Sequence, residues 1–232
     1  MLSLLLLGAP QILLAHQPLR VSRRKSRALL YYLAASLDPQ PRDHLLALLW
    51  PELDRPSAQQ TLRTTLYGLR KTLGDHLLVT DTTLALSPDA QVDLRAFLAH
   101  LPTVGHRVSP APPLTIPALT QTLALYRGEF LEGFSLPDSA PFDDWQTAQA
   151  EYLRRLTIRG YTTLSQLHEA GQEYHAALDA LDHALAFDPL QEDLQRVALR
   201  LHYLAGDRAG AIRRYDKLRS LLDEGNGRSP DG

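Results

Sequence analysis

Residues 58–73, AQQTLRTTLYGLRKTL, decide the fold that this sequence predicts. Apolar side chains recur there every three or four positions, which predicts a helix with one buried face. We expect Ser57 to cap the start of this helix, and Gly74 is a natural end for it. The residues predicted to face the core are Ala58, Leu62, Leu66, Leu69 and Leu73.

The opposite face of this helix carries polar and basic side chains, and no acidic residue occurs between Ser57 and Gly74. Arg and Gln can form paired hydrogen bonds with guanine and adenine edges, and Tyr and Lys can reach phosphates. A solvated helix face usually mixes both signs of charge, so we favour a nucleic-acid surface over that alternative. We expect base or groove contacts from Gln60, Arg63, Thr64 and Tyr67, and phosphate contacts from Arg70 and Lys71.

A cluster of cations marks the start of another predicted helix, from about Arg23 to Ser36, in the stretch VSRRKSRALLYYLAA at 21–35. Ser22 is expected to cap it. Each cation at a helix N-terminus opposes the helix dipole by about 0.3–1 kcal/mol, so the arrangement favours an anion bound there. A hydrated basic surface without a partner is the alternative. The predicted phosphate contacts are Arg23, Arg24, Lys25 and Arg27.

Shorter elements surround these two helices. Leucine-rich runs at 2–21, broken by turn signals, predict a small antiparallel sheet. The segment DHLLALLWP predicts a short helix that Asp43 caps and Pro51 ends. The segment HLLVTDTTLALSPD predicts two strands around a turn near 81–83.

The rest of the chain is predicted to be helical. Asp93 is expected to cap the helix VDLRAFLAHL, and PALTQTLALY predicts a helix beside a proline-rich loop at 102–117. From about Pro141 the chain reads as helices, with a 34-residue helix-turn-helix repeat that relates 158–191 to 192–225. Because such repeats cannot bury their faces alone, a helix at about 141–157 is expected to stack on them. The predicted repeat core includes Tyr161, Leu164, Leu181, Leu185 and Phe187, with a partner-binding groove as the alternative role.

Composition narrows the class of protein. The 232 residues are 44% hydrophobic and 22% charged, as in ordinary globular proteins, and include no cysteine. The net charge of -2 hides a basic stretch at 20–74, where ten basic residues stand against four acidic ones. This asymmetry indicates an anionic partner for the N-terminal half. The apolar start has no basic residue before it and is too short to span a bilayer, so we expect neither a secretory signal nor a membrane anchor.

No arrangement typical of catalysis is recognisable in the sequence. There is no glycine-rich phosphate loop, and the histidines of the repeat region lack the spacing of metal ligands. Asp143 and Asp144 fit the first turn of a helix, where acids favour the dipole, better than a catalytic carboxylate pair. We therefore expect no enzyme, no cofactor and no bound metal.

Several segments together resemble a known family. RRKSRALLYYLA, a short helix ending in LLWPE, QQTLRTTLYGLRKTLG and the hairpin LLVTDTTLALSP are similar to the OmpR-type winged helix of the streptomyces antibiotic regulatory protein family. Downstream, VDLRAF, ALYRGEFLEGFSLPDSAPFDDW and ALDHALAFDPLQEDLQ resemble the bacterial transcriptional activator domain of that family. The resemblance covers about residues 3–222.

The resemblance implies a mainly α fold in two domains. A winged-helix domain at 1–92, with three helices and small antiparallel sheets, would precede an all-α tetratricopeptide-like repeat domain at 93–223 that contains the proline-rich loop 102–117. The tail at 224–232 is expected to be disordered. Larger relatives continue into further domains, so the chain is either a small family member or part of a larger regulator.

The implied function is that of a sequence-specific DNA-binding transcriptional regulator, an activator in the cytoplasm associated with the nucleoid. Its partners would be double-stranded DNA, RNA polymerase and a second copy of the chain on DNA. The alternative is a helical-repeat adaptor that binds a protein partner without useful DNA affinity. By position, the resemblance places the wing at Thr80, Thr82 and Thr83, and a polymerase-contact loop at Glu52, Asp54 and Arg55.

Overall fold

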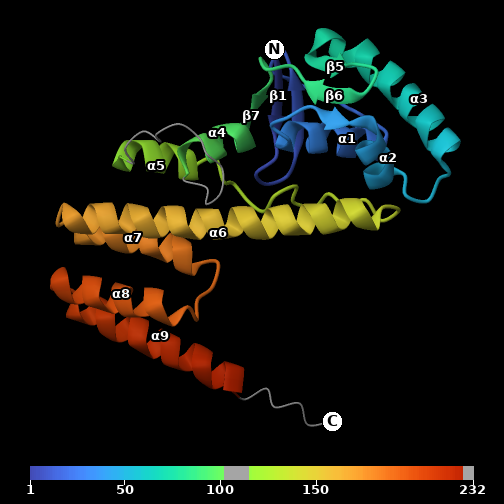
Figure 1. Ribbon diagram of the computed structural model, residues 1–232. Helices are drawn as coiled ribbons and strands as arrows, with labels where there is room; N and C mark the ends of the chain where they lie inside the picture. Colours follow the sequence, from blue (N-terminus) through green and yellow to red (C-terminus); the bar gives the residue numbers. More distant parts are fainter. Residues whose placement is uncertain (102–114, 227–232) are drawn as a thin grey trace, which may run out of the picture. The chain divides into compact units, whose positions relative to one another are not determined.

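The computed structural model describes residues 1–101 and 115–226 (Figure 1). Among these, residues 1–101 and 124–153 form one compact unit, and residues 115–123 and 154–226 form the other. The fold is mainly helical, with small sheets confined to the first unit. The predicted fold class, a winged helix followed by helical repeats, is confirmed.

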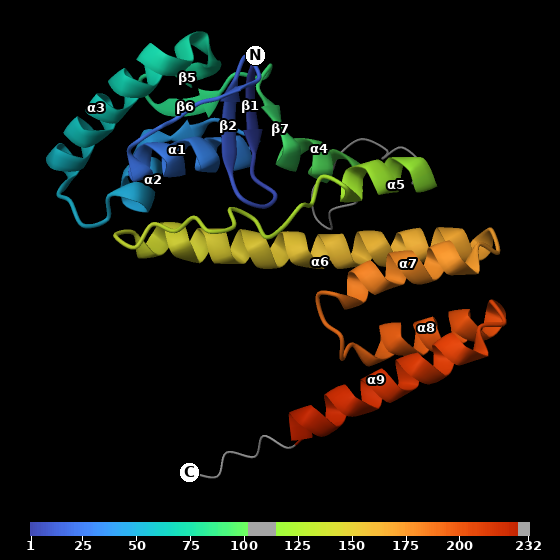
Figure 2. The ribbon, with the colours of Figure 1, turned by 180° about the vertical axis from the view of Figure 1, so that it is seen from behind.

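The first sheet is built from the N-terminal strands β1 (Leu2–Leu5), β2 (Gln11–Leu14) and β3 (Gln17–Pro18), which pair antiparallel as predicted. A fourth strand, β7 (Gln91–Val92), pairs parallel with β1, as Figure 2 shows from behind. This two-residue strand has no sequence pattern of its own. It forms because the chain returns to the free edge of β1 after the second sheet.

Three helices and a second sheet complete the winged helix. The helices are α1 (Arg24–Ala35), α2 (Arg42–Leu49) and α3 (Arg55–Leu73). After the 3-10 turn η1 (Gly74–His76), strands β5 (Leu77–Val79) and β6 (Thr83–Leu86) form the predicted hairpin. A short strand β4 (Gln40–Pro41) pairs with β6, so the hairpin is fixed to the segment that leads into α2.

All three N-terminal caps predicted for helices of this domain were wrong, whereas Gly74 ends α3 as predicted. The residue before α1 is Arg23, without a side-chain cap, so Ser22 lies outside the helix. Helix α2 follows Pro41 and contains Asp43 in its first turn. Asp54, not Ser57, caps α3 by accepting a hydrogen bond from the Ser57 N–H. Because proline has a helical φ and no N–H to satisfy, Pro56 fits the first turn, and α3 begins three residues earlier than predicted.

Replacing the Asp54 cap by asparagine gives a test at low pH. Hydrogen bonds from Ser57 hold the pKa of Asp54 below its usual value. A carboxylate whose pKa is lower in the folded state stabilises the fold at pH values above its unfolded pKa, and this contribution is lost as the pH falls through the folded value. Asparagine caps a helix about as well but does not titrate. Below about pH 4 the Tm of the wild type should therefore fall relative to the Tm of Asp54→Asn. Parallel Tm curves between pH 7 and pH 3 would contradict this role.

Residues 124–153 pack against the winged helix, so the compact units do not divide at the predicted boundary of 92/93. The backbone N–H of Leu131 donates to the carbonyl of Leu6, and that of Gly8 donates to Glu129. A Cβ on Gly128 would lie 3.2 Å from the Cα of Gly8, which is tighter than ordinary Cβ contacts. A side chain at this position of YRGEF would therefore require the Gly8 backbone to shift by a few tenths of an ångström.

Aromatic side chains fill the space between this segment and α1. The ring of Tyr31 meets that of Phe134 edge-on at 5.1 Å between centroids, and the ring of Tyr32 lies 4.7 Å from that of Trp145. The buried hydroxyl of Ser139 donates to the carbonyl of Leu48 in α2. These contacts make residues 124–153 part of the N-terminal core.

Asp93 is a buried acidic residue that links several segments of this unit. It was predicted to cap α4 (Asp93–His100), but the cap position belongs to Val92, and Asp93 is the first helical residue. Its carboxylate is only 3% exposed and accepts hydrogen bonds from the backbone N–H of Leu6 at 2.8 Å and of Leu7 at 3.2 Å. The guanidinium of Arg127 pairs with it at 2.8 Å. One carboxylate thus joins α4, the end of β1 and the segment at 124–153.

The helix predicted at 141–157 is not a separate element. It is the first half of α6 (Ala140–Ala170), which continues without a break into the repeats. Helix α5 (Ile116–Leu123) begins inside the predicted proline-rich loop 102–117, and the part of that loop at 102–114 lies outside the described residues.

The repeat is more regular in the structure than in the sequence. Helices α7 (Tyr174–Leu185) and α9 (Arg208–Asn226) begin 34 residues apart, and α6 and α8 (Glu192–Leu204) end 34 residues apart. The left-handed position after the first helix is Gln172 (φ 60°) in one copy and Gly206 (φ 73°) in the other. The turn glycines of the two copies, Gly171 and Gly206, are one position off this register because Gln172 takes the conformation usually given to glycine. The last three residues of α9 belong to the predicted tail, and 227–232 lie outside the described residues.

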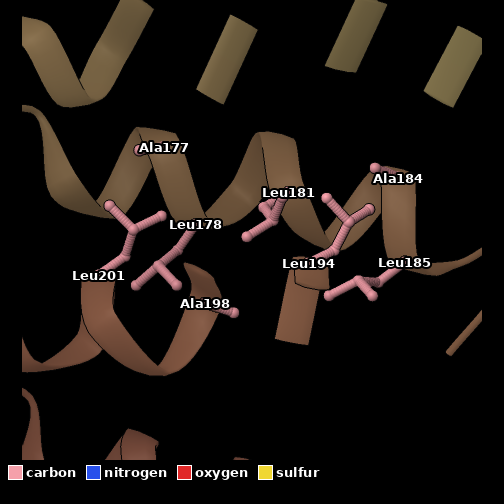
Figure 3. Close-up of a cluster of buried hydrophobic side chains, with 8 residues drawn as sticks. All are labelled: Ala177, Leu178, Leu181, Ala184, Leu185, Leu194, Ala198 and Leu201. Carbon is pink, nitrogen blue, oxygen red and sulfur yellow. The ribbon is translucent and has the colours of Figure 1, made fainter. Parts of the chain in front are cut away.

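The core of the repeats lies between α7 and α8 (Figure 3). Leu164, Leu181 and Leu185 are buried as predicted, whereas Tyr161 and Phe187 are half-buried. Small residues on α7 allow the two helices to approach closely. The cluster drawn in Figure 3 comprises Ala177, Leu178, Leu181, Ala184, Leu185, Leu194, Ala198 and Leu201.

Candidate nucleic-acid interface

The polar face of α3 is exposed along the whole helix. The five apolar residues predicted to face the core are buried, and none of the 19 helical residues is acidic. Tyr67 is 76% exposed, so its ring and hydroxyl are accessible from solvent. The exposed side chains on this face are Gln60, Arg63, Thr64, Tyr67, Arg70 and Lys71.

A groove of about 650 Å³ lies between α3, the start of α2 and strand β5. Its lining holds four cations and no acid, and in the described part of the chain Arg63, Arg70 and Lys71 have no acidic partner. The backbone N–H of Arg42 donates to the carbonyl of Thr82, which ties the start of α2 to the hairpin. The lining residues are Arg42, Arg63, Leu66, Tyr67, Arg70, Lys71 and Val79.

Arg42 was missed by the sequence analysis. It lies outside both basic clusters, and only the pairing of β4 with β6 brings it to the groove. Its Nε atom is buried and, among the described residues, has no hydrogen-bond partner. A basic residue directly after a proline at a helix start was the available signal. The structure therefore places a guanidinium at the N-terminus of α2, where both the charge and the helix dipole favour an anion.

The tip of the hairpin is a compact turn. The hydroxyl of Thr80 accepts hydrogen bonds from the backbone N–H of Thr83 at 2.9 Å and of Thr82 at 3.3 Å. Thr80 and Thr82 are exposed, and Thr83 is half-buried. The three predicted wing residues therefore lie together at the tip, and Thr80 sets its conformation.

The four cations at the start of α1 fall into two pairs. Lys25 is only 17% exposed and contacts Glu52 at 2.6 Å and Asp138 at 3.0 Å. Arg27 is half-buried, with its guanidinium 5.5 Å from the ring centre of Phe134. Arg23 and Arg24 are exposed. Two of the cations are therefore engaged within the protein, whereas Arg23 and Arg24 are exposed to solvent.

The three residues expected to contact polymerase also make internal contacts. Glu52 pairs with Lys25, and Asp54 caps α3. The guanidinium of Arg55 contacts both carboxylate oxygens of Asp43, at 3.0 and 2.9 Å. Beside them is a shallow hollow of about 370 Å³, lined by Asp43, Leu46, Ala47, Trp50, Pro51, Leu53, Arg55 and Ala58. The loop thus presents a surface that combines an exposed ion pair with an apolar hollow.

The described ranges 1–101 and 115–226 contain neither a metal-binding cluster nor a membrane-spanning helix. No group of three or more His, Asp or Glu side chains could hold a metal ion there. No helix in those ranges combines the length and the apolar character that crossing a membrane requires.

Comparison with known proteins identifies the family. The sequence model of the bacterial transcriptional activator domain matches residues 92–232, more than half of the chain. The chain belongs to the bacterial transcriptional activator domain family. This match confirms the resemblance drawn from the sequence, and the family is one of transcriptional regulators rather than a class of enzymes. The bacterial transcriptional activator domain match begins at 92, close to the predicted domain boundary, although 93–101 and 124–153 pack with the winged helix.

A solved structure shares the fold of this bacterial transcriptional activator domain protein. It is Mycobacterium tuberculosis EmbR in complex with a low-affinity phosphopeptide, at a TM-score of 0.71 and 24% sequence identity. The similarity covers 99% of this chain and 62% of the EmbR chain, so the chain spans less than two thirds of that protein's length. A search of curated proteins finds no match.

Proposed function

We propose that this chain is a transcriptional activator that binds specific duplex DNA sequences through its winged helix. The observation that carries the proposal is the exposed face of α3, which is free of acids and adjoins a groove lined by four cations. A helix fits the major groove of B-form DNA, and a neighbouring basic groove fits its phosphate backbone. A cation-lined surface of this kind has no use in a protein that binds only apolar or basic partners.

The exposed residues divide by reach and chemistry. Gln60, Arg63, Thr64 and Tyr67 would contact base edges, with the Arg63 guanidinium and the Gln60 amide able to make paired hydrogen bonds. The Thr64 hydroxyl donates to the Gln60 carbonyl at 3.1 Å, so it would act on DNA as an acceptor or through its methyl group. Phosphates would be held by a separate set, namely Arg23, Arg24, Arg42, Arg70 and Lys71, together with the wing at Thr80, Thr82 and Thr83.

Activation needs a contact with RNA polymerase, and we assign it to the loop at 52–55 with its neighbouring hollow. The exposed Arg55–Asp43 pair lies at the rim of that hollow, and Leu53 lines it. An apolar hollow with charged groups at its rim suits an inserted side chain from a protein partner. In this proposal the chain works in the cytoplasm on the nucleoid, as a self-associated complex on DNA, with no cofactor.

Binding to labelled duplexes over a salt series tests the proposal. A random pool and the DNA upstream of the chain's own gene are the two substrates. Binding whose log K falls with log salt by about 0.9 per phosphate contact, together with enrichment of one sequence from the pool, is the expected result. No retardation near 50 mM salt, with stable capture of a protein partner, would instead favour the adaptor function.

Arg63→Ala separates base reading from phosphate contact. We expect it to cost about 1–3 kcal/mol on the selected sequence and to relax the preference at one base position, because one paired base contact is lost. Arg24→Ala is the comparison, since an exposed phosphate contact should weaken selected and random DNA alike. Equal losses on both DNAs for both variants would remove Arg63 from the base-reading role.

A further inference from the structure

The loop that joins α2 to α3 is held at three points. Where the loop leaves α2, Trp50 is only 3% exposed. In its middle, the carboxylate of Glu52 pairs with the ammonium of Lys25 at 2.6 Å. At its end, Asp54 caps α3 by accepting a hydrogen bond from Ser57. The last contact is local to α3, whereas the other two points are supported by residues that are distant in the sequence.

Asp138 fixes the lysine that holds the middle of the loop. Its carboxylate lies 3.0 Å from the Lys25 ammonium, so two carboxylates converge on one cation. The side chain of Lys25 is only 17% exposed, and its ammonium lies 5.8 Å from the centre of the Trp50 ring. A lysine side chain is flexible when free, and two ionic contacts together with an aromatic ring restrict it. Lys25 thus joins the middle of the loop to the segment that contains Asp138.

Ser139, the next residue, supports the start of the loop. Its buried hydroxyl donates to the carbonyl of Leu48, in the last turn of α2. Carbonyls in the last turn of a helix have no partner within the helix, and Ser139 satisfies this one. The Ser139 hydroxyl also accepts a hydrogen bond from the backbone N–H of Phe142, in the first turn of α6. Ser139 therefore joins the start of α6 to the end of α2, two residues before Trp50.

We propose that Ser139 and the Lys25–Asp138 ion pair position the loop for its contact with RNA polymerase. This inference rests on the proposed function, which assigns that contact to residues 52–55. Asp138 and Ser139 lie in the part of the chain that the activator-domain model matches, whereas the loop belongs to the winged helix. They directly precede α6, which continues into the second compact unit. A change at the start of α6 would therefore alter activation and leave the DNA-binding face of α3 intact.

Hydrogen exchange at the Leu53 amide measures the order of the loop in the full chain without DNA. This amide donates to the carbonyl of Trp50 at 3.2 Å. Lys25→Met keeps an apolar side chain beside the Trp50 ring but removes the ammonium, so the two carboxylates lose their shared partner. Ser139→Ala removes the hydrogen bond to α2. We expect each variant to exchange the Leu53 amide at least about fivefold faster than the wild type.

Two control variants accompany this measurement. Lys25→Arg keeps a cation that can pair with both carboxylates, so it should restore the wild-type exchange rate. Ser135→Ala removes an exposed hydroxyl from the same segment and should leave the rate unchanged. Wild-type exchange in both Lys25→Met and Ser139→Ala, or an equal acceleration by Ser135→Ala, would overturn the proposal. Because the two carboxylates are 44% and 60% exposed, Lys25→Met should keep the fold, and it decides the test if Ser139→Ala does not fold.

Transcription assays separate positioning of the loop from DNA binding. On a template with the selected sequence, saturated with activator, Lys25→Met and Ser139→Ala should reduce the stimulation of RNA polymerase at least about fivefold. Their DNA affinity should stay within about twofold of the wild type. A parallel loss of DNA affinity in Lys25→Met would make Lys25 a phosphate contact, and normal stimulation despite faster exchange would overturn the role in activation. If the wild type binds no DNA, the proposed function fails, while hydrogen exchange still tests how the loop is held.

Discussion

Asp93→Ala is expected to lower the free energy of unfolding by about 3–5 kcal/mol. The carboxylate is 3% exposed and satisfies the backbone N–H groups of Leu6 and Leu7 as well as the Arg127 guanidinium. Removing it leaves two buried donors and one cation without their acceptor, and each loss adds its own desolvation penalty. Urea unfolding followed by circular dichroism measures the change.

Asp93→Asn is the control for this prediction. Its amide oxygen can still accept one of the N–H groups, but the amide NH₂ faces the other donors and the charge is gone. The free energy of unfolding of Asp93→Asn should therefore lie between that of the wild type and that of Asp93→Ala. A loss below about 1 kcal/mol for Asp93→Ala would mean that water replaces the carboxylate and that Asp93 does not hold α4 to β1.

Neutralising the groove should produce the largest effect on DNA binding. We expect the double variant Arg42→Gln, Arg70→Gln to weaken binding to every sequence by about 3 kcal/mol or more, since two charge-assisted contacts are lost. The magnitude of the salt slope should fall by about 1.8, which is two contacts at about 0.9 each. Fluorescence anisotropy with selected and random duplexes, at several salt concentrations, measures both quantities.

A matched control removes two cations elsewhere. Arg155 and Arg196 are exposed in the C-terminal unit, and their replacement by Gln changes the net charge by the same amount. If this control weakens binding as much as the groove variant, net charge rather than the groove determines affinity. If the single variant Arg42→Gln binds DNA as tightly as the wild type while Arg70→Gln binds more weakly, the phosphate lies along α3 and does not reach α2.

Local sequence patterns predicted the elements whose stability is local. The spacing of Leu62, Leu66, Leu69 and Leu73 predicted α3 and its buried face, and alternating residues predicted the β5–β6 hairpin. These signals work because a helix or a hairpin forms among neighbours in the chain. The exposed basic face followed from the same periodicity, since fixing one side of a helix fixes the other.

Features that depend on distant partners could not be predicted in this way. Lys25 looked like a phosphate ligand because Asp138, its partner more than a hundred positions away, has no local link to it. Arg42 looked unremarkable because only the pairing of β4 with β6 brings it to the groove. Asp93 was read as a cap because its N–H partners lie at the other end of the winged helix. In each case the sequence showed the charge but not its counterpart.

The N-terminal cap of α3 was predicted wrongly for a different reason, because two residues close together in the sequence can each cap a helix. Ser57 and Asp54 both can cap α3, and Pro56 between them decides in favour of the earlier residue because it is compatible with the first helical turn. In the repeats, Gln172 adopts a left-handed conformation that glycine would favour, so Gly171 and Gly206 lie one position off the predicted register. The predicted register of 34 itself, which relates Ala177-Leu178 to Ala211-Ile212, agrees with the spacing of the helices.

Helix α6 has a consequence for how the chain unfolds. Its residues 140–153 belong to one compact unit and its residues 154–170 to the other, without a break in the helix. Helical hydrogen bonds propagate cooperatively, so loss of structure in one half removes support from the turns of the other. The two cores should therefore melt in a single coupled transition rather than as independent bodies. Compact units are normally joined by exposed linkers, which proteases cut readily. Here residues 153 and 154 lie in the middle of a helix, so a protease or a truncation that separates the two units there has to break intact helical turns.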